Sequence, residues 1–246
     1  MAGSALVVAG VQVWSGVVIE RPEGPEGPKP PDPADLALLS PAERERVRRL
    51  VFDRDRVRYA GAHAGVRRAL GDHLGVPPES VGIGRAPCPA CGDPAHGPPR
   101  VATPVPLYLS LSRSGGRWLC AASPDHPVGV DLETERAVDL TGLPRLVLSE
   151  RERAYLTGQP EPAALGVFYR CWTRKEAVLK AVGVGLAADL TGLDVYPDRG
   201  GPVAVRYGLD ASAAGRAAGW LVHDLPVEPG LVAALAVPTT SPGNTR

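Results

Sequence analysis

The sequence predicts an α+β protein made of two similar, pseudo-symmetric lobes, in each of which helices pack on an antiparallel sheet. The first observation is that well-capped helical segments occur in both halves of the chain. The second is that runs of alternating apolar and polar residues follow them, joined by short turns such as Gly115-Gly116. One set of elements ends near residue 125, so we expect an N-terminal lobe over residues 1–124 and a C-terminal lobe over residues 125–246.

The bulk composition excludes several classes of protein. The chain has 27 basic and 27 acidic residues and a formal net charge of zero, so no global field attracts nucleic acid or an anionic membrane. Residues 2–19 carry no charge, but glycine, serine and glutamine dilute their apolar character, and no basic residue precedes them. We interpret them as buried strands rather than as a signal peptide or membrane span, and expect a cytoplasmic protein.

The helices of the N-terminal half begin after a proline- and glycine-rich loop over residues 21–35. Ser40 is a candidate N-cap, Pro41 suits the first helical position and Glu43 completes a capping box. We expect this helix to continue through Arg58 and a second helix to follow over residues 62–74. The many arginines of this region form either a solvated helix face or a surface that faces an anion.

A turn-rich loop over residues 88–100 holds Cys88, Cys91 and His96. This spacing invites a zinc site, but structural zinc takes four ligands and the sequence has no second CxxC or HxxxH motif. We therefore favour a loop with two thiols over a zinc-binding interaction domain. The absence of a secretory signal makes reduced thiols the expectation for all four cysteines.

The remaining elements alternate in the order expected for antiparallel sheets. We predict strands at 105–116, 117–123 and 127–133, and a helix at 149–156 that Ser149 caps together with Glu152. A longer helix runs from about residue 163 to Val182, where Gly183 ends it. Further strands are expected at 193–196, 203–207, 220–225 and 231–237.

Two carboxylates lie on one face of the strand VGVDLE, because side chains alternate along a strand and Asp131 and Glu133 are two apart. Such a pair forms either an exposed strand edge or, with a cation between the carboxylates, a site for a hard metal ion. Oxygen ligands without histidine or cysteine suit Mg²⁺, which also takes substrate phosphate oxygens.

The segment CWTRKEAVLKAVGVG carries three charged side chains on an otherwise apolar helix. Trp172, Glu176 and Lys180 are spaced four apart and share a face, which Lys175 flanks. Glu176 and Lys180 could simply pair across one helical turn. Alternatively, Glu176 joins Asp131 and Glu133 around one divalent ion, and Lys180 reaches a bound phosphate.

These two segments resemble the signature motifs GxDxE and WxxKEAxxK of the Sfp-type 4′-phosphopantetheinyl transferases. The resemblance extends upstream, where LSLSRSGG resembles the family's Ser-His-Ser segment and HGPPR its His-Gly-Lys-Pro-Arg segment. The arginine-rich helices after residue 39 also resemble those of the family. The chain length fits its two-lobed, monomeric type, with the active site in the cleft between the lobes.

The resemblance implies a Mg²⁺-dependent transferase, with Mn²⁺ as a substitute metal. Such an enzyme moves the 4′-phosphopantetheine group of coenzyme A to a serine of an apo acyl- or peptidyl-carrier protein and releases 3′,5′-ADP. The sequence does not choose between carriers of fatty acid, polyketide and nonribosomal peptide biosynthesis. The alternative is a non-catalytic paralogue that binds coenzyme A or a carrier protein.

The resemblance also implies roles for individual residues. The metal ligands would be Asp131, Glu133 and Glu176, the catalytic residues Glu176 and Lys180, and the contacts to coenzyme A Arg46, Arg58, Ser112, Arg113, Lys175 and Lys180. Two positions depart from the family pattern, since Arg113 replaces a histidine and Pro98 a lysine. The segment LTGLPRLVL at 140–148 is either a docking site for a carrier protein or a core helix.

Overall fold

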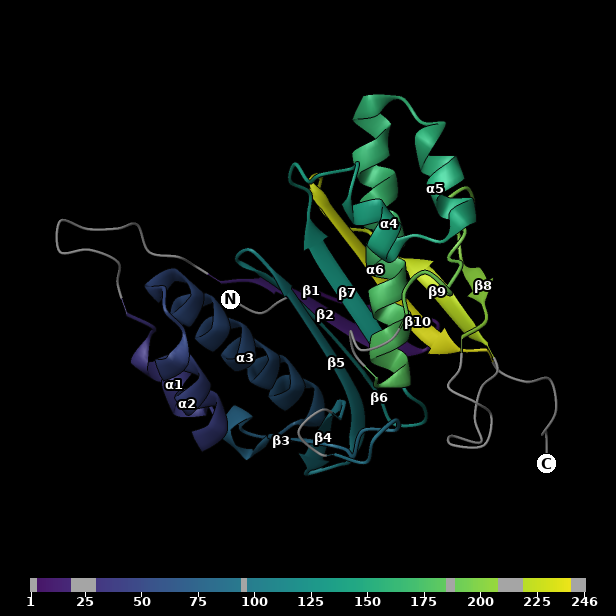
Figure 1. Ribbon diagram of the computed structural model, residues 1–246. Helices are drawn as coiled ribbons and strands as arrows, with labels where there is room; N and C mark the ends of the chain where they lie inside the picture. The colour runs from purple at the N-terminus through teal and green to yellow at the C-terminus, as the bar shows by residue number, and fades with distance from the viewer. Residues whose placement is uncertain (1–3, 19–29, 94–96, 185–188, 208–218, 240–246) are drawn as a thin grey trace, which may run out of the picture.

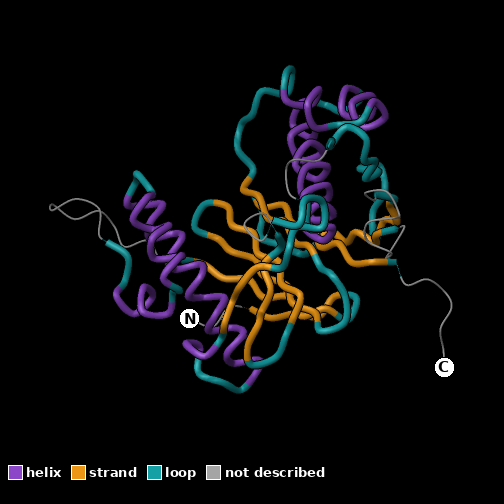
Figure 2. Tube along the Cα trace, turned by 60° about the horizontal axis from the view of Figure 1, so that its bottom comes forward, coloured by secondary structure: helices purple, strands orange, loops and turns teal. Residues whose placement is uncertain are grey.

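The computed structural model describes residues 4–18, 30–93, 97–184, 189–207 and 219–239. Helices and two antiparallel sheets make up the chain (Figure 1), which confirms the predicted α+β class. In Figure 2 the strands occupy the middle of the molecule, and the helices of the two halves lie on different sides of them. Among the helices of the described residues, none is long and apolar enough to cross a membrane.

The first sheet has six strands in the order β1-β2-β6-β5-β4-β3. Its strands are β1 (Ser4–Val8), β2 (Val11–Val17), β3 (Gly82–Arg85), β4 (Pro99–Thr103), β5 (Leu107–Ser114) and β6 (Arg117–Ser123). The helices of this half are α1 (Pro33–Leu38), α2 (Pro41–Arg49) and α3 (Asp53–Leu74), followed by the short 3₁₀ turn η1 (Pro78–Ser80). Helix α1 begins inside the loop predicted over residues 21–35 and β4 inside the loop predicted over 88–100, and β3 lies where the sequence pattern predicted no element.

The predicted helix boundary near residue 60 is wrong. The capping box of Ser40 and Glu43 is present, but α2 ends at Arg49 because the backbone of Leu50 is extended. Helix α3 then runs without interruption for 22 residues. Arg56 fixes this break, since its side chain donates to the Leu50 carbonyl at 2.9 Å and pairs with Asp53 at 2.6 Å.

The second sheet has four strands in the order β7-β10-β9-β8. Its elements are β7 (Gly129–Thr134), α4 (Leu143–Val147), α5 (Glu150–Thr157), α6 (Glu161–Val182), β8 (Val203–Val205), β9 (Trp220–Asp224) and β10 (Leu231–Pro238). The strand predicted at 193–196 is wrong, because this segment is a loop in which Tyr196 has a φ of 49°. Its backbone carbonyls accept hydrogen bonds from side chains of α6 instead of a neighbouring strand.

A shared hydrophobic core joins the two sheets. Each half has a core under its long helix, α3 in the first and α6 in the second. A further cluster combines Val13 of β2 and Leu119 of β6 with Val130 of β7 and Leu235 of β10, all of them at most 2% exposed. The two sheets are therefore packed together through apolar side chains from both.

Candidate active site

Helix α6 lies unusually close to strand β7. A Cβ atom placed on Gly129 would lie 1.9 Å from the carbonyl oxygen of Ala177, a distance that no side chain tolerates. Only glycine allows the backbones of the strand and the helix to approach this closely. The close approach brings Asp131 of β7 next to Glu176 and Lys180 of α6.

Lys180 and Asp131 form the centre of the site. The Lys180 ammonium lies 2.6 Å from Asp131 Oδ1 and donates to the Ser112 hydroxyl at 3.0 Å. The Ser112 hydroxyl in turn donates to Asp131 Oδ1 at 2.8 Å. Asp131 is 3% exposed and Ser112 7%, so this three-residue contact is nearly closed to solvent. The i,i+4 pairing of Lys180 with Glu176 is replaced by pairing with Asp131.

Burial and the neighbouring negative charge raise the pKa of two carboxyl groups of the site, Glu176 and Glu133. Burial, and next the negative charge of Asp131, raise the pKa of Glu176 to about 7, although the Lys180 ammonium acts in the opposite direction. Burial likewise raises the pKa of Glu133, and the charge of Asp131 adds to the increase. More negative charge is gathered here than the single lysine neutralises.

Two carboxylate oxygens at this place are buried without a hydrogen-bond partner, Asp131 Oδ2 and Glu176 Oε1. A buried, unsatisfied carboxylate oxygen is costly unless a cation completes it. An oxygen-only donor set of this kind fits a hard divalent cation. Within the described residues, however, no three His, Cys, Asp or Glu side chains are already arranged as a metal-binding group. The residues fit a cation chemically, but the three-carboxylate arrangement stays a prediction.

Three serines of β5 bridge the two sheets at this site. Ser110 and Ser114 accept hydrogen bonds from the backbone N–H groups of Val130 and Thr134, at 3.0 and 2.9 Å. Strand β7 is the edge of its sheet, and β5 runs beside it (Figure 1). The hydroxyl groups thus satisfy edge N–H groups that no backbone strand pairs. We call Ser110, Ser112 and Ser114 the serine bridge.

The serine bridge also positions both carboxylates of β7. Ser112 donates to Asp131, as described above, and the Ser114 hydroxyl donates to Glu133 Oε2 at 2.8 Å. The Trp172 indole lies close enough to Glu133 to act against the rise in the pKa of that carboxyl group.

Lys175 does not belong to this site, and its predicted phosphate contact finds no support. Its side chain is fully buried, with the ammonium 2.7 Å from Glu152. The same ammonium donates to the carbonyl oxygens of Leu190 and Leu193, at 2.7 and 2.6 Å. All three ammonium protons are thus used inside the protein, so Lys175 has a structural role.

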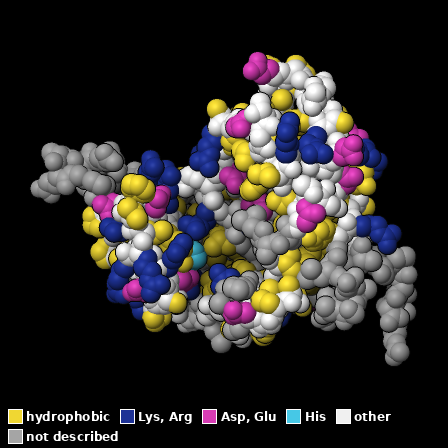
Figure 3. Space-filling view, viewed as in Figure 1, with side chains coloured by type: hydrophobic (Ala, Val, Ile, Leu, Met, Phe, Trp, Pro, Cys, Tyr) yellow, Lys and Arg dark blue, Asp and Glu magenta, His cyan; other side chains and the backbone are white. Residues whose placement is uncertain are grey.

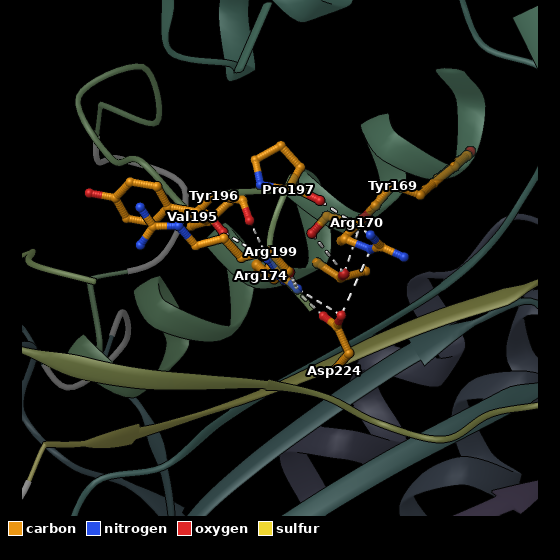
Figure 4. A network of polar contacts seen from close by, with 9 residues as sticks. Tyr169, Arg170, Arg174, Val195, Tyr196, Pro197, Arg199 and Asp224 are labelled. Atoms are coloured by element: carbon orange, nitrogen blue, oxygen red, sulfur yellow. Dashed lines mark hydrogen bonds and ion pairs between the residues drawn. The ribbon is translucent and has the colours of Figure 1, made fainter. Parts of the chain in front are cut away.

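Arg174 is a second buried cation on α6, and Figure 4 shows how it holds the neighbouring loop. Its guanidinium donates to both carboxylate oxygens of Asp224, at 2.8 and 2.7 Å. It also donates to the carbonyl oxygens of Val195, Tyr196 and Arg199. Together with Lys175 it fixes the loop after α6 to the helix, which keeps the helix and its site residues in place.

A cluster of basic side chains forms where α2 and α3 meet strand β5 in the N-terminal half. Arg113 follows Ser112 on β5, and its guanidinium stacks on the Tyr59 ring at 4.8 Å. Arg46 lies near enough to act electrostatically on both Tyr59 and Arg113. Figure 3 shows Lys and Arg side chains gathered over the helices α1 to α3, beside a hollow of the molecular surface. We call Arg46 and Arg113, together with the Tyr59 ring on which Arg113 stacks, the basic cluster.

A buried network of polar side chains on α2 and α3 holds the Tyr59 ring of the basic cluster in place. The Tyr59 ring stacks on His63 at 4.1 Å, and His63 Nδ1 lies 2.8 Å from Glu43. Arg67, which is 3% exposed, pairs with the same carboxylate at 2.8 Å. Glu43 also caps α2, so one carboxylate ties the start of α2 to the middle of α3.

Three other residues named from the sequence lie outside both groups of contacts. Arg58 is half-buried on α3, one residue before Tyr59, and its predicted contact to coenzyme A stays a prediction. Pro98 packs against Gly183 at the end of α6. Arg100 stacks on Tyr108 at 4.0 Å.

The sequence reasoning missed Ser110, Ser114 and Tyr59. The alternation of the two serines with Leu111 and Arg113 could have identified them, because it places them on the same face of the strand as Ser112. No sequence pattern could have identified Tyr59, because its contact with Arg113 depends on how α3 lies against β5.

Comparison with known proteins places this geometry in a class. Residues 127–234, which contain β7, α6 and the rest of the second sheet, match the 4′-phosphopantetheinyl transferase superfamily. This region is similar to that superfamily, and the resemblance to its Sfp-type members is confirmed.

Individual relatives extend the match beyond this region. The chain is 36% identical over 152 residues to the 4′-phosphopantetheinyl transferase HetI of Nostoc sp., covering 61% of this chain and 62% of that protein. It is 26% identical over 168 residues to the human L-aminoadipate-semialdehyde dehydrogenase-phosphopantetheinyl transferase, covering 63% of this chain and 52% of the relative. Sfp of Bacillus subtilis is 23% identical over 170 residues, with 69% and 71% covered. The alignments thus span about half to two thirds of the first two relatives.

Proposed function

We propose that this chain transfers the 4′-phosphopantetheine group of coenzyme A to a serine of an apo acyl- or peptidyl-carrier protein. The observation that carries the proposal is the group of Asp131, Glu176 and Lys180, in which two buried carboxylate oxygens have no partner and one ammonium stands beside them. A protein that only binds a partner gains nothing from such a costly arrangement. The names of the matched relatives support the same reaction.

Each residue of the site has a part in the proposed reaction. Glu176 accepts the proton of the carrier serine hydroxyl, and the serine oxygen attacks the β-phosphorus of coenzyme A. The bond from that phosphorus to the bridging oxygen breaks, and 3′,5′-ADP leaves. Lys180 stabilises the negative charge on the transferred phosphate. Asp131, Glu133 and Glu176 would hold a divalent cation such as Mg²⁺, which would neutralise charge at the pyrophosphate.

The N-terminal lobe, residues 1–124, would hold the nucleotide part of coenzyme A. Arg46 and Arg113 of the basic cluster supply positive charge for its phosphates, and the arginine fork can bind a phosphate with two hydrogen bonds. We assign Ser112 to the positioning of Asp131 and Lys180, because its hydroxyl already contacts both. Arg113 keeps the cation where the family has histidine.

The C-terminal lobe, residues 125–246, would bind the metal and the carrier protein. Helix α4 exposes Leu146 at 73% and Leu143 at 38%, with Arg145 between them, whereas Pro144 and Val147 are buried. This mixture of exposed leucine and arginine suits an acidic, partly apolar carrier helix. We therefore favour docking here over the core-helix alternative, and expect a cytoplasmic monomer.

A mass measurement on the carrier tests the proposal. The full chain is incubated with coenzyme A, Mg²⁺ and each of several apo-carrier proteins, and the carriers are weighed. The expected result is the mass increment of phosphopantetheine on the acceptor serine, lost in Asp131→Asn and Glu176→Gln. No increment on any carrier, with coenzyme A still bound, would instead favour the non-catalytic paralogue.

A further inference from the structure

The turn that holds Cys88 and Cys91 is tightly closed. The Gly92 N–H donates to the Cys88 carbonyl at 2.8 Å, and the Cys88 N–H donates to the Asp93 carbonyl at 3.1 Å. Gly92 adopts a φ of +76°, which glycine reaches without strain. The turn, which we call the dithiol turn (residues 88–93), therefore holds its two cysteines close together, with both side chains as thiols.

The two sulfur atoms of the dithiol turn differ in their surroundings. Cys88 is 5% exposed, whereas Cys91 is exposed. The Cys88 sulfur accepts hydrogen bonds from the backbone N–H groups of Cys91 and Ala90, which lower the pKa of the Cys88 thiol. The Cys91 side chain also hydrogen-bonds to this sulfur. The Cys88 sulfur, whose thiolate form these hydrogen bonds stabilise, thus lies beside the Cys91 sulfur, which is exposed to solvent.

We propose that Cys88 and Cys91 form a reversible disulfide by exchange with a low-molecular-mass disulfide. The Cys91 sulfur attacks one sulfur of the small disulfide, one small thiol leaves with a proton, and Cys91 carries the mixed disulfide. The Cys88 sulfur then attacks the Cys91 sulfur, and the second small thiol leaves with the second proton. Two protein thiols are oxidised, and one small disulfide is reduced to two thiols.

The other cysteines of the chain lack this reactivity. Cys120 and Cys171 are both 0% exposed, and burial raises the pKa of each thiol well above its usual range. They lie in the cores of the two halves, where a reagent in solution does not reach them. They serve as controls within the same molecule.

A metal ion is the competing occupant of the dithiol turn. Structural zinc takes four ligands, and the third candidate that the sequence offered, His96, lies outside the described residues. A disulfide requires only the two sulfur atoms that the turn already supplies. The observations therefore favour the disulfide.

The dithiol turn lies against the end of the helix that carries the site. A Cβ atom placed on Gly183 would lie 3.4 Å from Cδ of Pro89, one of the two residues between the cysteines, and 3.1 Å from Pro98 Cγ. Gly183 follows Lys180 by three residues. The modification would therefore take place in direct contact with the C-terminal end of α6.

The test uses the reduced full-length protein, treated with oxidised glutathione, quenched with an alkylating reagent and analysed by mass spectrometry. We expect a loss of about 2 Da, with Cys88 and Cys91 linked in one peptide. Cys120 and Cys171 should be alkylated only after denaturation, and dithiothreitol should restore the original mass. Cys88→Ser should keep a stable glutathione adduct on Cys91, because the second thiol that releases it is gone.

Three results would overturn the proposal. The wild type could keep glutathione adducts without closing the disulfide, or its turn could react no faster than Cys120. The purified protein could also retain one equivalent of zinc that must be removed before the thiols react, which would make the turn a metal site. Circular dichroism of each variant separates these outcomes from a failure to fold.

Discussion

At the scale of single residues, two lysines on one helix have opposite roles. Lys180 lies at the centre of the site, and its side chain is 27% exposed beside Asp131. Lys175, five residues earlier, is fully buried and pairs with an equally buried Glu152. Residue type and spacing could not separate them, because the difference depends on the loop over residues 190–195 that closes over Lys175.

Replacing Lys175 should therefore lower stability rather than affect coenzyme A binding. We expect Lys175→Met to reduce the free energy of unfolding by about 3–5 kcal/mol, since it leaves the Glu152 charge buried without its partner. Urea unfolding followed by circular dichroism measures the change. Adding Glu152→Gln, which keeps an acceptor for the Val195 N–H, should recover part of the loss. A variant of normal stability with a raised KM for coenzyme A would instead restore the phosphate role.

Ser114 should act on the site through Glu133. Ser114→Ala removes a hydrogen bond that orients this carboxylate, so we expect the dissociation constant for the divalent cation to rise about tenfold, or about 1.4 kcal/mol. Electron paramagnetic resonance of Mn²⁺ measures the affinity without any turnover. Ser15→Ala on β2 is the matched control, because its hydroxyl contacts only the Ser4 hydroxyl at the surface. Equal Mn²⁺ affinity in both variants would contradict the role of Ser114.

At the scale of elements, the close packing of α6 on β7 depends on one glycine. We expect Gly129→Ala to lower the free energy of unfolding by about 3 kcal/mol, because the added Cβ meets backbone atoms that cannot rotate away. Thermal unfolding measures the loss. Gly84→Ala on β3 is the control, since its Cβ would meet nothing within 4 Å. Similar melting temperatures for the two variants would mean that the helix can move away without cost.

The elements that the sequence predicted well are those with local signals. The capping boxes at Ser40 and Ser149 fix where α2 and α5 begin, and Gly183 ends α6 with a φ of +86°. The segment at 193–196 has an apolar pattern that suggests a strand, but the buried Arg174 uses its carbonyl groups. That interaction joins residues about 20 positions apart and leaves no trace in local periodicity.

At the scale of the whole molecule, the shared core should make the two halves unfold together. Leu119 lies in that core and is 2% exposed, so we expect Leu119→Ala to cost about 2–5 kcal/mol. The chain offers tryptophan probes in both halves, Trp14 and Trp118 in the first and Trp172 and Trp220 in the second. Single-tryptophan variants should give coincident denaturation curves. Two separate transitions would show that the halves are independent.

The sequence could predict several residues of the site, but not the contacts between them. The strand period placed Asp131 and Glu133 on one face, the helical spacing placed Glu176 and Lys180 on another, and the resemblance implied their roles. The sequence could not show that Lys180 pairs with Asp131, or that Ser112 joins both, because these contacts arise where β5, β7 and α6 meet. Tertiary contacts of this kind decide which of several charged side chains become functional.

The serine bridge has a consequence for how such a molecule can diversify. Strands that pair through their backbones keep their register when a side chain is replaced. Strands β5 and β7 instead meet through serine hydroxyl groups, and one substitution can remove such a group or exchange it for a longer or charged side chain. Single substitutions among these serines can thus change the distance between Arg113 and strand β7 in small steps. A substitution at this junction can therefore move Arg113 relative to Asp131 while the backbone pairing within both sheets remains intact.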